Sequence, residues 1–283
     1  MMKCCDLHTH SVFSDGTFTP AQIIDLAEKA GLSAVALCDH NTVDGLEQFH
    51  AAAKGKEIEA IGGIELSTEY HGQDLHVLGL YIHPDHYESL TGLMEEANRK
   101  KTEANRNLVY ALNAAGYRMD YDEICAATPG GHINRAHIAA ALTAKGYTES
   151  VSDAFDTLLS EESGYYRVPD RINVFDAIRY LRSIGAVVIL AHPFYDLTEQ
   201  ELEEFLVPAL EAGLDGIEVL YSSYTMEERQ IAARIAKSFD LVPGGGSDFH
   251  GANKPDIQIG CGKGDLFVPI AFLDAIKTRK NQR

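Results

Sequence analysis

Short apolar runs along the chain repeatedly end in a histidine or a carboxylate. One run covers residues 33–38 and leads into Asp39-His40, and another covers residues 186–191 and leads into His192. Longer amphipathic stretches separate these runs, which is the pattern of βα units around a buried parallel sheet. In barrels built from such units, the chemistry takes place at the carboxyl ends of the strands. The chain is therefore expected to form an α/β barrel whose strand ends share one polar site.

A His-x-His pair near the N-terminus follows another short apolar run, which comes before the two named above. Residues two apart in an extended segment point to the same side, so His8 and His10 can direct two imidazoles at one metal ion. Asp15, on the loop that follows, can reach the same ion or a neighbouring one. Taken alone, the pair could be two surface histidines. Because further His, Asp and Glu residues follow later apolar runs, the sequence favours a site for several metal ions.

The other candidate ligands are imidazoles and carboxylates further along the chain. They are His40, Glu65, His76, His192, Asp248 and His250. A ligand set without thiolates suits manganese, iron or zinc and differs from a structural, sulfur-rich zinc site. His76 lies near the start, not the end, of the run 75–81. Either this strand runs in the opposite direction or the barrel is distorted there.

The order and spacing of these residues resemble the four motifs of the PHP (polymerase and histidinol phosphatase) family. The matching segments are His8-Thr9-His10, Asp15, Asp39-His40, Glu65, His76, Ala191-His192-Pro193 and Gly246-Ser247-Asp248-Phe249-His250. Together they extend over nearly the whole chain. The resemblance implies a distorted (β/α)7-type, TIM-like barrel (the PHP fold) with metal-dependent phosphatase or phosphoesterase activity.

The resemblance also implies how the ligands divide among two or three divalent ions. His8, His10, Glu65 and Asp248 would hold one ion, Glu65, His76 and His192 a second, and Asp15, His40 and His250 a third. Manganese is the first expectation, with iron or zinc as alternatives. Such ions lower the pKa of a bound water and clamp the phosphoryl oxygens during in-line displacement.

A segment at residues 132–139, His-Ile-Asn-Arg-Ala-His-Ile-Ala, is similar to the Arg-x-His-Ile/Phe motif of certain PHP enzymes. Those enzymes hydrolyse the 3′-phosphate of nucleoside 3′,5′-bisphosphates (pAp to AMP), and some also trim short 5′-phosphorylated RNA. The similarity implies two catalytic residues, Arg135 as a phosphate clamp and His137 as a hydrogen-bond donor or general acid. The implied substrate-binding residues are His40, Asn134, Arg135, Ala136, His137, Ile138 and His250.

Two other functions compete with this interpretation. A histidinol-phosphate phosphatase would share the metal cluster but would not need the Arg-x-His segment. An inert PHP module, as found attached to some polymerases, commonly lacks ligands, whereas every expected ligand position is filled here. Without the resemblance, Arg135 would be read as a solvated charge on a helix. Glu218 is expected to form a structural ion pair outside the site, and the other histidines to be surface or packing residues: His50, His71, His83 and His86.

The stretch 86–165 breaks the alternation of strands and helices. It contains helical patterns at 90–115, 121–127, 135–145 and 151–160, with no convincing strand between them. We expect a helical insertion at 86–165 that caps the active site of a barrel formed by 1–85 and 166–283. The helices expected around the barrel lie near 20–31, 43–54, 173–184, 198–212, 226–238 and 269–279.

The net charge of −18 disfavours a broad basic surface for duplex nucleic acid. A small nucleoside bisphosphate or the end of a short RNA fits this charge better, because bound cations would neutralise phosphate locally. No obligate protein partner is evident. Five unpaired-looking cysteines, the lack of a secretion signal and the lack of a long apolar run predict a cytoplasmic protein without membrane contact.

Overall fold

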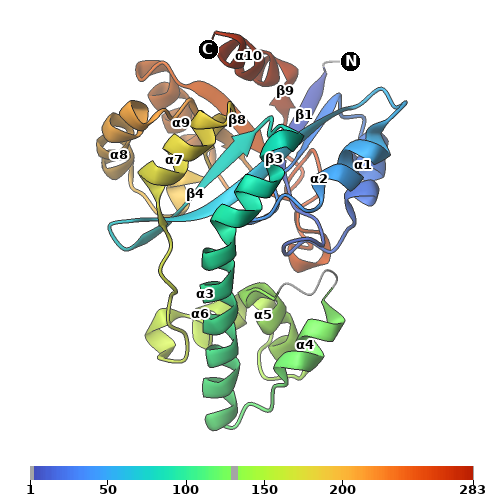
Figure 1. The fold of residues 1–283 in the computed structure, drawn as a ribbon, viewed down its shortest axis with the longest axis vertical. Helices are drawn as coiled ribbons and strands as arrows, with labels where there is room; N and C mark the ends of the chain where they lie inside the picture. The colour runs from blue at the N-terminus through green and yellow to red at the C-terminus, as the bar shows by residue number, and fades with distance from the viewer. Residues whose placement is uncertain (1–2, 129–132, 283) are drawn as a thin grey trace.

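The computed structural model describes residues 3–128 and 133–282. The longer strands are β1 (Cys4–Thr9), β2 (Ala34–Leu37), β3 (Glu59–Tyr70), β4 (Gln73–Leu80), β6 (Val187–Leu190), β7 (Gly216–Tyr221) and β8 (Val242–Gly246). Two short strands are β5 (Ile172–Asn173) and β9 (Val268–Pro269). All pair into one sheet in the order β8-β7-β6-β4-β3-β2-β1-β9, with β5 beside β3. Figure 1 shows this sheet rolled into a nearly closed barrel, which confirms the predicted α/β barrel.

The barrel closes where β1 meets the segment that follows β8. The N–H of Asp248 donates to the carbonyl of His8 (2.8 Å), and the N–H of His10 donates to the carbonyl of Phe249 (2.9 Å). This close approach requires glycine at position 246, because a Cβ there would lie 2.4 Å from the Cβ of His8. The closure therefore places the first and the last candidate ligands of the sequence side by side.

Strand β4 runs antiparallel to both of its neighbours, β3 and β6. The turn between β3 and β4 consists of His71 (φ 50) and Gly72 (φ 84), and two successive positive φ angles are typical of a type I′ hairpin turn. His76, near the start of β4, lies beside the end of β6, where its carbonyl accepts the N–H of Ala191 (2.9 Å). Of the two explanations considered for His76, the reversed strand is therefore correct.

Six helices of the described chain cover the barrel. They are α1 (Pro20–Lys29), α2 (Leu46–Ala53), α7 (Val174–Ser183), α8 (Glu199–Ala212), α9 (Met226–Ser238) and α10 (Ile270–Asn281). The start of α1 follows the local sequence, because Thr19 caps the helix through Gln22 and Pro20 occupies its first turn. None of the helices in the described residues combines the length and the apolar character needed to cross a bilayer.

The helices α3 (Tyr87–Ala114), α4 (Tyr121–Ala127), α5 (Arg135–Ala144) and α6 (Val151–Thr157) lie between β4 and β5 in the chain. They have a hydrophobic cluster of their own, which includes Leu108, Leu112, Ile138 and Leu142. Figure 1 shows α3 extending away from the barrel, with α4, α5 and α6 gathered along its distal part. This helical segment is therefore joined to the barrel chiefly through α3.

One face of α3 changes character along its length. Leu90 and Met94, near its start, are buried in the core of the barrel, whereas Leu108 and Leu112, near its end, are buried in the helical segment. Between these pairs, the positions three or four residues apart on one helix face are polar, namely Asn98, Lys101 and Asn105. Two of these residues, Lys101 and Asn105, line a cavity between the two cores.

We predict that Gly246→Ala destabilises the barrel by about 1–3 kcal/mol, the usual cost of overpacking, because the new Cβ would collide with His8. Urea unfolding measures the change. Gly92→Ala is the matched control, since a Cβ on this helical glycine meets nothing within 4 Å. The control should gain up to about 1 kcal/mol from helix propensity. Equal stability of the two variants would contradict the close approach of β8 and β1.

Candidate metal centre

The carboxylate of Glu65 lies at the centre of the site, buried at 1% exposure on β3. Three ring nitrogens surround its Oε2 atom: His8 Nε2 at 3.3 Å, His10 Nε2 at 3.2 Å and His40 Nδ1 at 3.0 Å. Two more approach Oε1: His76 Nδ1 at 2.9 Å and His192 Nε2 at 3.1 Å. Imidazoles from four strands of the barrel, or from the loops that follow them, thus converge on one carboxylate.

Several of these buried atoms lack hydrogen bonds. Among the described residues, no hydrogen-bond partner is found for His8 Nε2, His10 Nε2, His40 Nδ1 or Glu65 Oε2. Buried polar atoms are nearly always paired in folded proteins, and leaving one unpaired costs about 1–3 kcal/mol. Lone pairs that face one another in this way are the arrangement that a metal ion requires. The donor set, imidazole and carboxylate without thiolate, fits a site for divalent metal ions.

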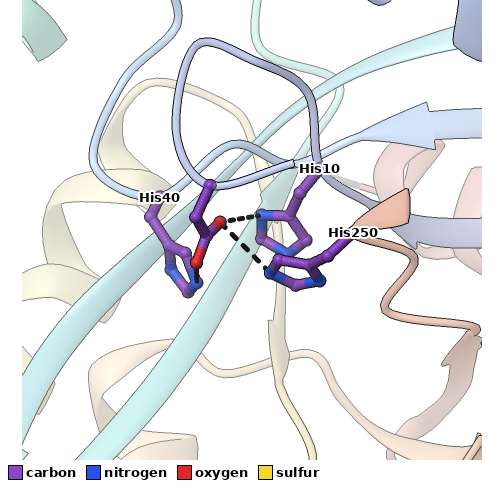
Figure 2. Close-up of side chains that lie close together, drawn as sticks. His10, His40 and His250 are labelled. Carbon is purple, nitrogen blue, oxygen red and sulfur yellow. Dashed lines mark ion pairs between the residues drawn. The ribbon is translucent and has the colours of Figure 1, made fainter. Parts of the chain in front are cut away.

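A second group of possible ligands surrounds Asp15. Its carboxylate lies 3.1 Å from His250 Nε2, 3.7 Å from His40 Nε2 and 3.8 Å from His10 Nδ1. Figure 2 shows the rings of His10, His40 and His250 arranged around one carboxylate group. His10 and His40 also face Glu65, so the two groups share their histidines. Adjacent ligand groups of this kind are suited to bind more than one ion.

The carboxylates of the cluster favour positive charge at its centre. Burial alone would lower the pKa of His10, but Asp248 and Glu65 raise it to about 9. Burial also opposes the charged form of His76, but Glu65 and Asp74 raise its pKa to about 10. Metal ions bind to neutral imidazole and displace such protons, since they supply the positive charge themselves. The carboxylates thus favour the charged forms of His10 and His76, whereas burial holds the pKa of His40 well below its ordinary value.

Residues outside the candidate set hold the ligands in place. Glu218 is fully buried; its Oε1 lies 3.0 Å from His8 Nδ1, and its Oε2 accepts the N–H of His192 (2.7 Å). Tyr221 donates to Asp248 Oδ2 (2.6 Å), and Lys254 contacts the same oxygen. Glu218, expected to form a structural ion pair outside the site, thus contacts two of the candidate ligands, and its place at the end of an apolar run was a usable signal. Nothing local in the sequence pointed to the other two supporting residues.

Comparison with known proteins agrees with this geometry. Residues 6–166 match the family described as the PHP domain. A 5′-3′ exoribonuclease from Haemophilus influenzae is 33% identical over 251 residues, covering 88% of this chain and 91% of the relative. The chain belongs to the PHP family. It is thus a member of a family of metal-dependent phosphoesterases, and its buried His, Asp and Glu clusters are consistent with a PHP site for several metal ions.

Other relatives match over a similar length. A 3′,5′-nucleoside bisphosphate phosphatase from Chromobacterium violaceum is 29% identical over 261 residues, covering 92% of this chain and 91% of the relative. Among solved structures, a protein from Bifidobacterium adolescentis assigned as a metal-dependent phosphoesterase is 29% identical, with a TM-score of 0.86. That match covers 98% of this chain and 96% of the other, so the PHP barrel and the helical segment are both shared.

The PHP site opens into a cavity of about 150 Å³ between the barrel and the helical segment. Three candidate ligands line it: Asp15, His40 and His76. Three basic residues line it as well: Lys101, Arg135 and Arg171. Arg171 pairs with Asp74 (2.8 Å), whereas Lys101 and Arg135 have no ion-pair partner among the described residues. The cavity therefore presents two basic side chains without an ion-pair partner beside the metal cluster, and burial lowers the pKa of one of them, Lys101.

The guanidinium of Arg135 is held by aromatic rings. Its central carbon lies 4.5 Å from the ring centroid of Tyr166 and 5.6 Å from that of Phe155. Asn134, the N-cap of α5, accepts the N–H of His137 (3.2 Å) and donates its own N–H to His137 Nδ1 (3.1 Å). The proton of this ring is consequently on Nε2, because Nδ1 acts as an acceptor.

The other residues implied by the Arg-x-His resemblance are placed differently. Asn134 and Ala136 line the cavity with Arg135, whereas Ile138 is fully buried in the hydrophobic cluster of the helical segment. His250 faces Asp15 in the metal cluster. His132 lies outside the described residues. The histidines expected to be surface or packing residues lie on α2, in the β3–β4 turn and around the 3-10 helix Pro84–His86, namely His50, His71, His83 and His86.

We predict that Glu65→Gln lowers both metal content and phosphate release, the latter by at least about a hundredfold. An amide cannot replace the charged carboxylate that lies among several histidine ligands. Elemental analysis and a phosphate-release assay measure the two quantities. Glu69→Gln on the same strand is the control, since within the described part of the chain its carboxylate accepts an N–H of the β3–β4 turn and lies outside the cluster. Unchanged metal content in the first variant would show that Glu65 is not a shared ligand.

We also predict that Glu218→Gln weakens metal binding by about 10–100-fold, the usual effect of losing the carboxylate behind a metal-bound histidine. The fold should persist, because the amide oxygen can still accept one of the two hydrogen bonds. Titration of metal-free protein with Mn²⁺ measures affinity, and circular dichroism checks the fold. An affinity equal to that of the parent protein would assign Glu218 a purely structural role.

Proposed function

We propose that this protein hydrolyses the 3′-phosphate of nucleoside 3′,5′-bisphosphates, such as pAp to AMP, and cuts the corresponding bond in short 5′-phosphorylated oligoribonucleotides. One observation carries the proposal: the cavity that contains the candidate metal ligands also contains the unpaired charges of Lys101 and Arg135. A substrate with two phosphates satisfies both features. One phosphate would bind at the metal cluster and the other beside the two cations.

The first turn of α5 is suited to hold the second phosphate. Arg135 is the first residue of this helix, where backbone N–H groups have no partner within the helix and the helix dipole favours an anion. Its guanidinium fork matches two phosphate oxygens, and the rings of Tyr166 and Phe155 restrict its orientation. Local positive charge of this kind lets a chain with a net charge of −18 bind a polyanion.

In the proposed reaction, the phosphorus–oxygen bond to the ribose 3′-oxygen breaks and a bond to a water oxygen forms. Metal ions held by the His, Asp and Glu residues of the cluster would lower the pKa of a water molecule and neutralise phosphoryl oxygens. Arg135 holds the 5′-phosphate so that the 3′-phosphate faces the cluster. Burial lowers the pKa of His137, so its ring is neutral and its Nε2–H is a hydrogen-bond donor. Of its two expected roles, we assign it a hydrogen bond to the substrate phosphate.

The ligand sets implied by the sequence remain our proposal for the ions. We propose up to three, with manganese first and iron or zinc as alternatives, because imidazole and carboxylate suit all three metals. His8, His10, Glu65 and Asp248 would hold the first ion, Glu65, His76 and His192 the second, and Asp15, His40 and His250 the third. We also propose that residues 86–165 form a cap over a barrel of residues 1–85 and 166–283.

The alternatives fit the cavity less well. Histidinol phosphate has a single phosphate and a cationic amine, which the charges of Lys101 and Arg135 would repel. An inert module would not need to keep a complete cluster of converging ligands. The relatives from Haemophilus influenzae and Chromobacterium violaceum are named for RNA and for nucleoside bisphosphates respectively. Both names support a nucleotide substrate, and the second supports a bisphosphate.

We predict that Arg135→Ala lowers kcat/KM for pAp by tens to hundreds of fold, on the order of one lost charge-assisted bidentate contact. Hydrolysis of a small aryl phosphate should fall much less, because it depends mainly on the metal ions. Metal content should not change. Arg179→Ala, on the exposed side of α7, is the control. An equal loss on both substrates would indicate a structural role for Arg135 and remove support for a bisphosphate substrate.

A further inference from the structure

A second cavity lies directly beside the first. It has a volume of about 280 Å³, compared with about 150 Å³ for the cavity that contains Arg135. The two share four lining residues: His40, Asn41, Lys101 and Asn134. A ligand that passes the metal cluster at His40 can therefore occupy both cavities at once.

The chemistry of the second cavity differs from that of the first. Leu90 and Met94 of α3 line it together with the partly exposed ring of Phe13. Its exposed rim includes two acidic residues, Asp44 and Glu95. Of the described lysines and arginines, Lys101, which it shares with the first cavity, is the one that lines it. Such walls disfavour another phosphate and suit a flat, uncharged group.

Polar atoms accompany this apolar surface. Asn98, one turn before Lys101 on α3, donates to the carbonyl of Asn41 (3.1 Å) and so fixes the wall between the cavities. Thr91 and Thr102, on the exposed sides of the same helix, add hydroxyl groups at the rim. An aromatic ring, an apolar floor and a few hydroxyl or amide groups are the features that bind a nucleobase with its ribose.

Short RNA and a nucleoside bisphosphate differ at one place. In a bisphosphate, the 3′-phosphate ends in free oxygens, whereas in RNA one of these oxygens is bonded to the 5′-carbon of the next nucleoside. An RNA substrate therefore needs space on the far side of the phosphate from the 5′-terminal nucleotide. The first cavity holds Arg135, and the second adjoins it at His40 and the three other residues that the two cavities share.

We propose that the second cavity binds the nucleoside that follows the scissile phosphate in a 5′-phosphorylated oligoribonucleotide. This inference rests on the proposed function. Both substrates would use the same active site, and the oligonucleotide would occupy the second cavity as well. Hydrolysis breaks the bond between phosphorus and the 3′-oxygen of the first nucleotide, and the 3′-oxygen takes up a proton. The water oxygen joins the phosphorus, which stays on the second nucleoside as a new 5′-phosphate.

The test compares the dinucleotide pApA with pAp, which differ only in the second nucleoside. Thr102→Trp should fill the second cavity from an exposed helix position. We expect kcat/KM for pApA to fall by at least about tenfold and kcat/KM for pAp to stay within about twofold of the parent value. Asn107→Trp is the matched control, because this exposed residue of α3 lines a separate surface hollow and should change neither value.

A second variant tests the contact with the base. Phe13→Ala should raise KM for pApA on the order of tenfold, the usual loss from removing one stacking ring, with metal content and pAp turnover unchanged. Equal effects of Thr102→Trp on both substrates, or no effect on pApA, would overturn the inference. A parent protein that hydrolyses pAp but not pApA would overturn it too and leave the bisphosphatase proposal intact. A parent protein that hydrolyses pApA but not pAp would overturn the bisphosphatase proposal alone.

Discussion

The burial of the Glu65 carboxylate among imidazoles is the interaction on which the rest of the site depends. Its side chain is 1% exposed, and both of its oxygens face ring nitrogens. Removing an ionised group from water costs several kcal/mol unless opposite charge compensates it. The barrel provides the compensation by bringing strand ends together, and Glu218 and Asp248 add further negative charge around the same rings. A site so rich in carboxylates is stable when cations occupy it.

Much of this centre could be predicted because each ligand follows its own apolar run, and parallel strands deliver their ends to one side of a barrel. The direction of β4 could not be predicted, because it depends on pairing with β3 and β6 and not on the local sequence around His76. Lys101 was missed for a similar reason. It is one of two adjacent lysines on a long helix, and only the separation of two hydrophobic cores reveals that it faces the cavity. The role of Arg135 was predicted through resemblance alone and stays a prediction.

The contrast between global and local charge follows from this arrangement. The chain is strongly acidic, so phosphate is repelled at long range, and recognition depends on a few residues within contact distance. Lys101 and Arg135 come from different helices of the helical segment, whereas the candidate ligands come from the barrel. In the proposed function, the substrate would therefore be held between two distinct hydrophobic cores. Each core contributes a different chemistry, the barrel its metal ligands and the helices their cations.

The continuous helix α3 constrains how the two cores are oriented relative to each other. A single α-helix carries the barrel contacts of Leu90 and Met94 and the distal contacts of Leu108 and Leu112, so its winding sets the orientation of one core to the other. Adding one residue between them would rotate the distal core by about 100°, because a turn takes 3.6 residues. Such a chain would turn the Arg135 side of the segment away from the barrel. The length of α3 can therefore change only by whole turns, which would make the distance between metal centre and anion site vary in steps of about 5.4 Å.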